Sequence, residues 1–148
     1  MDNLKDRTLT IERTLNAPVK VVWDAWSQAE HVAKWWAKGM PIRIDEHEFR
    51  VGGKWKYVME MPDGNEFISH GEYLEIEEFK KIISTANFIP MTEGVEIQVL
   101  LEEQGEETKF TFNVIHDTVE YCQQQEQMGF YNGWVSVFEK LNEYIQGM

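Results

Sequence analysis

The sequence predicts an α+β fold, in which an antiparallel sheet carries helices on one side. Three observations support this prediction. Two short helical patterns precede a long region of alternating polar and apolar residues, that region contains clear turn signals, and one long helical pattern follows it. A run of strands followed by a helix is typical of an antiparallel sheet with its helices on one face. The chain has 148 residues, and we expect residues 1–148 to form one domain.

A strand and a short helix open the chain. Residues 8–14 alternate between polar and apolar side chains, with Leu9 and Ile11 on one face, which is the period of a strand. Asn16 then offers a side-chain cap for a helix. Pro18 fits the first turn of that helix, because the first amides of a helix have no partner within it.

Four tryptophans lie in this helix and in a second one that follows it directly. Ser27 is expected to cap the second helix, with Glu30 as the other half of a capping box. Trp35 and Trp36 are about 100° apart around a helix, so they cannot share one face. The apolar positions of the two helices are Val19, Val22, Trp23, Trp26, Val32, Trp35 and Trp36.

Six further strands are expected in the middle of the chain. Asp63 and Gly64 form a tight hairpin turn between two of them, because this pair supplies the positive φ that such a turn needs. The alternating segments are residues 42–44, 54–61, 67–77, 80–88, 95–102 and 108–116.

From about Val119 the apolar residues follow a helical period. Gly129 and Gly133 lie inside this pattern, where a glycine costs about 1 kcal/mol relative to alanine. We therefore expect them to permit close packing against the sheet or to leave space for another group. Asp117 or Thr118 is expected to cap the helix. One continuous apolar stripe is predicted on one long helix, formed by Met128, Tyr131, Trp134, Phe138, Leu141 and Ile145.

Three segments of the chain resemble a known family. They are ERTLNAPVKVVWDAWSQAEHVAKWW near the start, GGKWKYVMEMPDGNEFISHGEYLEI in the middle and GWVSVFEKLNEYI near the end. In this order they resemble the START-like superfamily, also called SRPBCC, and within it the family of homologues of the activator of the heat-shock-protein-90 ATPase. The resemblance implies the helix-grip fold, a curved seven-stranded antiparallel sheet around a long C-terminal helix, with two short helices closing one end.

The resemblance also implies a cavity between the sheet and the C-terminal helix. Proteins of this superfamily typically carry a hydrophobic small molecule there, and some relatives are cyclases, aromatases or hydrolases. Because one fold serves many functions, the resemblance alone does not choose among them. In the helix-grip order, Trp23 and Trp26 are expected to plug the closed end. One of Trp35 and Trp36 should anchor the two helices, and the other should line the entrance or meet a partner.

The charge and the composition exclude several classes of function. Lys and Arg number 14 against 26 Asp and Glu, so the formal net charge is -12, which disfavours nucleic acids and anionic membrane surfaces. No apolar run is long enough to cross a bilayer. The single cysteine, Cys122, cannot form an intrachain disulfide, so we expect a cytoplasmic protein.

No metal, cofactor or catalytic motif is present in the sequence. The four histidines stand apart at positions 31, 47, 70 and 116, without the spacing of a metal site. The expected ligand is therefore a hydrophobic small molecule bound without catalysis. The residues expected to contact it are Trp26, Trp35, Trp36, Trp55, Tyr57, Met59, Met61, His70, Glu72, Phe110, Phe112, Met128, Tyr131, Trp134 and Phe138. The alternative is a core that side chains fill completely.

Two further functions remain open from the sequence. If Ile68, Leu74 and Ile76 point inward, strict alternation places His70 and Glu72 inward as a general acid and base, with Tyr57 or Tyr131 as hydroxyl donor. A bulge between Phe67 and Tyr73 would instead turn His70 and Glu72 to solvent. The third possibility is an interaction protein, in particular a stress-related chaperone partner, present as a monomer or a homodimer.

Overall fold

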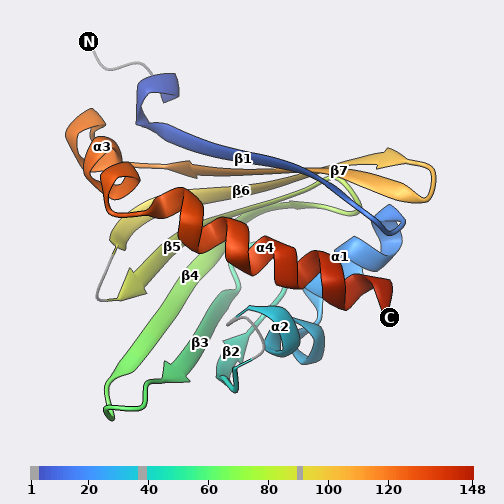
Figure 1. Ribbon diagram of the computed structural model, residues 1–148, viewed down its shortest axis with the longest axis horizontal. Coiled ribbons are helices and arrows are strands. Elements are labelled where there is room, and N and C mark those ends of the chain that lie inside the picture. Colours follow the sequence, from blue (N-terminus) through green and yellow to red (C-terminus); the bar gives the residue numbers. More distant parts are fainter. Residues whose placement is uncertain (1–3, 37–39, 90–91) are drawn as a thin grey trace.

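A curved seven-stranded antiparallel sheet wraps around a long C-terminal helix, as the sequence predicts (Figure 1). The computed structural model describes residues 4–36, 40–89 and 92–148. The helices are η1 (Leu4–Arg7, a 3₁₀ turn), α1 (Val19–Ser27), α2 (Ala29–Trp35), α3 (Val119–Gln127) and α4 (Phe130–Gln146). The strands are β1 (Thr8–Leu15), β2 (Arg43–His47), β3 (Lys54–Glu60), β4 (Glu66–Glu77), β5 (Lys81–Ile89), β6 (Thr92–Gln104) and β7 (Glu107–Ile115).

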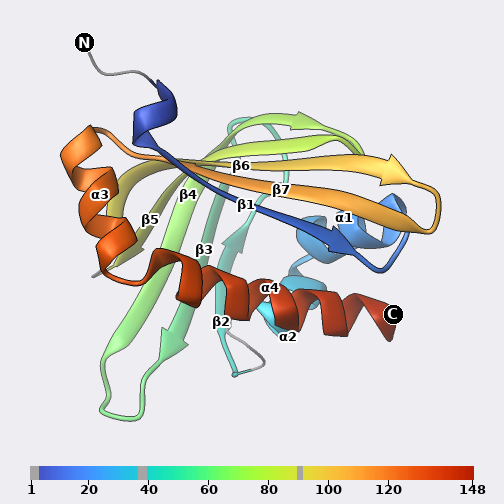
Figure 2. The ribbon, with the colours of Figure 1, turned by 45° about the horizontal axis from the view of Figure 1, so that its top comes forward.

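The strand order pairs the first strand with the last. The sheet runs β1-β7-β6-β5-β4-β3-β2, so β1 pairs with β7 and the remaining strands follow as hairpins. The long helix α4 lies across the concave face of this sheet (Figure 2). Helices α1 and α2 lie at the end where the chain terminates, and α3 lies at the opposite end (Figure 1).

Aromatic rings fill the end that α1 and α2 close. Trp26 stacks on Phe110 at 5.9 Å and on Phe112 at 6.4 Å between ring centroids, and it meets Phe138 of α4 at 6.4 Å. Phe110, Phe112 and Phe138 are at most 1% exposed. Burying rings of this size is worth several kcal/mol each, so this cluster fixes α1 and the second half of α4 to the sheet.

The predicted continuous helix is in fact two helices. α3 ends at Gln127 and α4 begins at Phe130, because Gly129 adopts a left-handed conformation with φ +100°. An α-helix cannot pass through that conformation. Gly133 has ordinary helical geometry, and a Cβ added there would meet no atom within 4 Å. The two glycines therefore differ: the first interrupts the helix and the second leaves open space.

Two of the predicted helix caps are wrong, and one is confirmed. Pro18 occupies the cap position of α1 without a side-chain hydrogen bond, while the backbone N–H of Asn16 donates to the side chain of Asn142 at 2.9 Å. Ser27 is the last residue of α1, so α2 follows after the single residue Gln28. Thr118 caps α3, accepting a hydrogen bond from the backbone of Tyr121, as expected.

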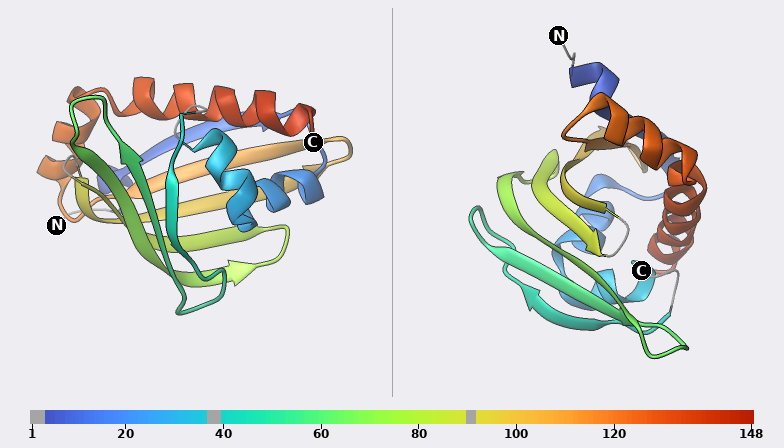
Figure 3. Two further views of the ribbon diagram at one scale, coloured as in Figure 1. Left: turned by 90° about the horizontal axis from the view of Figure 1, so that it is seen from below. Right: turned by 90° about the vertical axis from the view of Figure 1, so that its left-hand side faces the viewer.

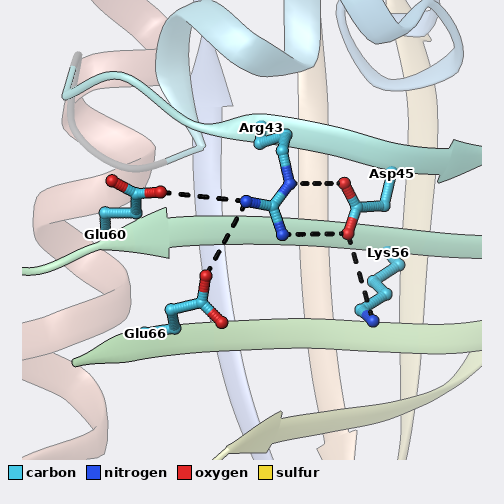
Figure 4. Close-up of polar contacts among 5 residues, drawn as sticks. All are labelled: Arg43, Asp45, Lys56, Glu60 and Glu66. Atoms are coloured by element: carbon cyan, nitrogen blue, oxygen red, sulfur yellow. Dashed lines mark hydrogen bonds and ion pairs between the residues drawn. The ribbon is translucent and has the colours of Figure 1, made fainter. Parts of the chain in front are cut away.

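A charged cluster ties the three strands at one edge of the sheet together. Arg43 of β2 donates to Asp45 at 2.6 Å and lies 3.8 Å from Glu60 and 3.7 Å from Glu66 (Figure 4). The hydrogen bond from Arg43 lowers the pKa of Asp45. The cluster lies on the face of the sheet away from α4, and it is exposed. Such pairs contribute little to stability because solvent and salt screen them.

Replacing each of the two glycines by alanine should have opposite effects on stability. Gly129→Ala places a Cβ at a left-handed position and should lower the free energy of unfolding by about 1–2 kcal/mol. Gly133→Ala should raise it by up to about 1 kcal/mol, because alanine is the better helix former and meets no neighbour. Urea denaturation of both variants and the unchanged protein measures this. Equal effects of the two substitutions would contradict the assigned break in the helix.

Candidate ligand cavity

A cavity of about 480 Å³ lies between α4 and the concave face of the sheet. This volume is within the range of small-molecule sites in proteins. Its walls come from the end of α2, from four strands and from both C-terminal helices. The lining residues are Trp36, Met40, Ile42, Tyr57, Met59, Met61, Phe67, Ser69, Phe88, Val114, His116, Gln125, Met128, Gly129, Phe130, Gly133, Trp134 and Val137.

The cavity opens to solvent between separate elements. Met40, Met61 and Met128 line it and are 45%, 37% and 54% exposed, and Gly133 is exposed too. They come from the segment before β2, the β3–β4 hairpin, the α3–α4 junction and the first turn of α4. The right view of Figure 3 faces the side where this hairpin and α3 lie. We call these four residues the mouth of the cavity.

Six of the residues expected to contact a ligand line this cavity. They are Trp36, Tyr57, Met59, Met61, Met128 and Trp134. The alternation of β3 places Tyr57 and Met59 in this wall, and the stripe of α4 places Trp134 there, as the sequence analysis expects. Their role as ligand contacts stays a prediction.

The other nine expected residues do not line it. Trp26 and Trp55 border only a second void of about 20 Å³, and Tyr131 is 38% exposed beside Phe130. Trp35, Phe110, Phe112 and Phe138 are buried in the packed end of the molecule, where each ring contacts other rings. The sequence pattern marks a face as apolar, and it does not separate the part of that face that packs from the part that borders a cavity. His70 and Glu72 are the remaining two.

The acid and base pair proposed from alternation lies outside the cavity. Ser69 and Tyr73 are the buried residues of β4 in this stretch, and Ser69 lines the cavity, so His70 and Glu72 point to the opposite face. Glu72 is exposed. The pairing of β4 with β5 shifts between Tyr73 and Glu75, which reverses the phase and leaves Leu74 42% exposed. The expectation that His70 and Glu72 point inward, which rests on Leu74 and Ile76, is therefore wrong, because these two pairs of residues lie on either side of the shift or outside the core.

Trp36 lines the cavity wall, and Trp35 anchors α2 to α1. The indole N–H of Trp35 donates to the carbonyl oxygen of Ala25 at 2.9 Å, and the ring is fully buried. Trp36 instead lines the cavity, contacts Tyr57 and Trp134 at 5.3 and 5.9 Å, and donates to Ser69 Oγ at 3.4 Å. Trp35 thus takes the expected anchoring role, whereas Trp36 lines the cavity wall and is not one of the mouth residues.

Tyr57 lines the cavity, and a chain of hydrogen bonds through His47 holds its side chain in place. Its hydroxyl lies 2.7 Å from His47 Nδ1, and His47 Nε2 lies 2.7 Å from the carbonyl oxygen of Ser27. A carbonyl oxygen only accepts, so Nε2 of His47 carries a proton, and the Tyr57 hydroxyl is paired with Nδ1. Burial, and then the neighbouring Tyr73, raise the pKa of Tyr57 well above its ordinary value. Tyr57 is therefore a neutral phenol that links β3 to the end of α1.

His116 is a buried polar group in the same wall. It directly follows β7, is 1% exposed and lines the cavity. Its Nδ1 lies 3.3 Å from the carbonyl oxygen of Arg7, so that nitrogen carries a proton. Burial lowers the pKa of His116, although backbone oxygens of Arg7 and Val114 act against the shift. The ring is held neutral near pH 7, with Nε2 as its hydrogen-bond acceptor.

His116 is not among the ligand contacts expected from the sequence, although the expected strand over residues 108–116 ends on it. Its phase with Phe110, Phe112 and Val114 is the signal that locates it in the wall. The other lining residues outside the expected set come mostly from neighbouring strands and from the segments beside the glycines. They are Met40, Ile42, Phe67, Ser69, Phe88, Val114, Gln125, Gly129, Phe130, Gly133 and Val137.

No cluster of His, Cys, Asp and Glu that could hold a metal ion occurs in residues 4–36, 40–89 and 92–148. Cys122 is buried, and burial raises the pKa of its thiol. Across the same described ranges, no helix combines the length and the apolar character needed to span a membrane.

The sheet, the gripped helix and the cavity between them define a START-like protein of the helix-grip type. The family model described as "Activator of Hsp90 ATPase homolog 1-like protein" matches residues 16–146, and the chain belongs to this family. Comparison with curated protein sequences finds no match.

Several solved structures share the whole fold. Protein NE0264 from Nitrosomonas europaea has a TM-score of 0.83 and 26% identity, with 99% of each chain covered. Protein Ms6760 from Mycobacterium smegmatis has a TM-score of 0.84 at 23% identity, covering 99% of this chain and 96% of that one. An AHSA1-like protein from Aeromonas hydrophila has a TM-score of 0.74 at 20% identity, covering 95% and 92%. The two structures below 25% identity establish a common fold only.

The buried imidazole of His116 should make stability depend on pH. Because its pKa is lowered in the folded protein, the unfolded chain takes up its proton at a higher pH than the folded chain does. The stability that depends on keeping the His116 ring neutral is fully present above about pH 6.5 and is lost as the pH falls below that value. His116→Asn does not titrate, so the unchanged protein should lose stability relative to this variant between about pH 7.5 and pH 5.5. Urea denaturation across this range measures the difference, and a constant difference would contradict a neutral buried ring.

Proposed function

We propose that this protein binds and carries a hydrophobic small molecule in the cavity beneath α4, without catalysing a reaction. The observation that carries this proposal is the cavity itself, about 480 Å³ in volume, with mostly aromatic, aliphatic and methionine side chains in its wall. We further propose a cytoplasmic location, since the chain has a single cysteine.

The composition of the wall supports binding of an apolar molecule. Trp36, Phe88 and Trp134 offer rigid area from α2, β5 and α4, while Met59 and Met61 adapt their shape to what they contact. Apolar surface removed from water contributes roughly 25 cal/mol per Å². A ligand that covers this wall therefore gains affinity without any charged contact.

The polar groups of the cavity support binding rather than catalysis. His70 and Glu72 lie on the other face of the sheet, so the acid and base pair of the enzyme hypothesis is missing from the cavity. Tyr57 is tied to His47, and its raised pKa keeps it protonated. Tyr57 is therefore not a base near neutral pH, and His116, the one imidazole among the described lining residues, has no Asp or Glu beside it in the wall to complete an acid and base pair.

Filling the mouth should reduce ligand binding without unfolding the protein. N-phenyl-1-naphthylamine is an uncharged dye whose fluorescence increases in apolar surroundings, and we expect it to bind the unchanged protein. Gly133→Leu places a side chain in open space at the mouth and should weaken binding by about tenfold. Fluorescence titration with the dye measures both affinities.

Glu139→Leu is the matched control, because it adds the same side chain to an exposed position of α4 that does not line the cavity. It should leave the affinity for the dye unchanged. If the unchanged protein does not bind the dye, or if the two variants weaken binding equally, the cavity is not the binding site.

A chaperone-related role is the second candidate, and the family description favours it, since it names an activator of the Hsp90 ATPase. This role predicts that the purified chain binds Hsp90 and raises its rate of ATP hydrolysis. Measuring that rate with increasing amounts of the chain tests it. We rank this role second and expect no increase in the rate of ATP hydrolysis. The cavity supports the carrier function, whereas the family description alone supports the chaperone-related role.

A further inference from the structure

Among the residues that the structure describes, the wall of the cavity has no charged side chain. Of the described residues that line it, none is Asp, Glu, Lys or Arg, although the chain as a whole has a net charge of -12. An anion that enters would lose its hydration without meeting a cationic partner, which is costly in an apolar site. The negative charge of the protein adds a repulsion at longer range. The cavity is therefore suited to uncharged ligands.

His116 supplies a fixed hydrogen-bond acceptor in that wall. Its backbone N–H donates to the carbonyl oxygen of Arg7 at 2.7 Å, and its own carbonyl oxygen accepts from the Arg7 guanidinium at 2.7 Å. The Tyr121 ring packs against the imidazole in a T-shaped arrangement, at 5.5 Å between centroids. These contacts hold the ring in one orientation. Since Nδ1 donates to Arg7, Nε2 of the neutral ring has no hydrogen and can only accept.

The other polar side chains of the wall already have partners. Ser69 Oγ accepts the indole N–H of Trp36, and the Tyr57 hydroxyl contacts His47. The side-chain amide of Gln125 lies 4.0 Å from the sulfur of Met128. An acceptor on the ligand, such as an ether or ketone oxygen, finds no donor at Nε2 of the neutral ring. A hydroxyl hydrogen does find an acceptor there.

We propose that the cavity selects an uncharged ligand with a hydroxyl group, which donates its hydrogen bond to Nε2 of His116. This proposal rests on the proposed function and adds the ligand class. His116 lies at the junction of β7 and α3, so the hydroxyl end of the ligand points toward α3. The apolar body then lies along Phe88, Trp134 and Trp36.

Three probes of similar size separate these requirements. 1-Decanol donates a hydrogen bond, 1-methoxynonane has the same number of non-hydrogen atoms and only accepts, and decanoate carries a negative charge. Each is titrated against the protein with bound N-phenyl-1-naphthylamine, and loss of dye fluorescence gives its affinity. We expect 1-decanol to bind about fivefold more tightly than 1-methoxynonane, the gain from one hydrogen bond. Decanoate should bind at least about a hundredfold more weakly than 1-decanol.

A pair of substitutions tests whether His116 is the acceptor. In His116→Asn the side-chain amide can replace Nδ1 toward Arg7, but nothing replaces Nε2, so the advantage of 1-decanol over 1-methoxynonane should disappear. In His116→Gln the longer side chain places an oxygen near the position of Nε2, so most of the advantage should remain. The comparison of the two probes in the unchanged protein needs no variant, and it tests the hydroxyl preference even if both substitutions reduce folding.

Each outcome decides one of the two proposals. If 1-decanol and 1-methoxynonane bind equally to the unchanged protein, or if His116→Asn weakens both equally, the role of His116 is overturned and the carrier function stands. Equal binding of decanoate and 1-decanol would overturn the selection for uncharged ligands. If neither the dye nor any probe binds, the carrier function itself fails.

Discussion

The packing of Trp26 against Phe110, Phe112 and Phe138 is the contact on which the cavity depends. These rings join α1, β7 and the second half of α4 at one end of the molecule. Because this end is filled, α4 is held rigidly there. Its first half, which carries the exposed Gly133, borders the cavity. A single helix thus serves as core at one end and as cavity wall at the other.

The order of the strands and the apolar face of most of them could be predicted from the sequence, because both follow from the period of apolar residues. The limit of this reasoning is visible on α4. Trp134 and Phe138 lie one helical turn apart on the same stripe, yet Trp134 lines the cavity and Phe138 is buried in the core. The period of apolar residues indicates which face of a helix or strand is apolar. Which part of that face is packed depends on rings from other elements, and the period does not indicate it.

Two local features of the backbone differ from the sequence-based expectation, and both matter for the site: the shift in β4 lies after Tyr73 rather than between Phe67 and Tyr73, and Gly129 breaks the expected continuous helix. The shift in pairing after Tyr73 reverses the phase of β4, so Ser69 faces the cavity in place of His70. The left-handed conformation of Gly129 ends α3 and places Met128 at the mouth. A bulge and a glycine break leave the average pattern unchanged, because each alters the chain at one residue only.

The chemistry of the cavity follows from how its polar groups are paired. A buried polar group is costly unless it has a partner, and most such groups in this wall bond to the protein itself. The hydrogen bond from Nδ1 of His116 to the backbone of Arg7 fixes which ring nitrogen is protonated, and burial keeps the ring uncharged. The strand pairing of β1 with β7 brings Arg7 to that position, since Thr8 lies opposite Ile115. The register of the first and last strands therefore determines which kind of hydrogen bond the cavity offers to a ligand.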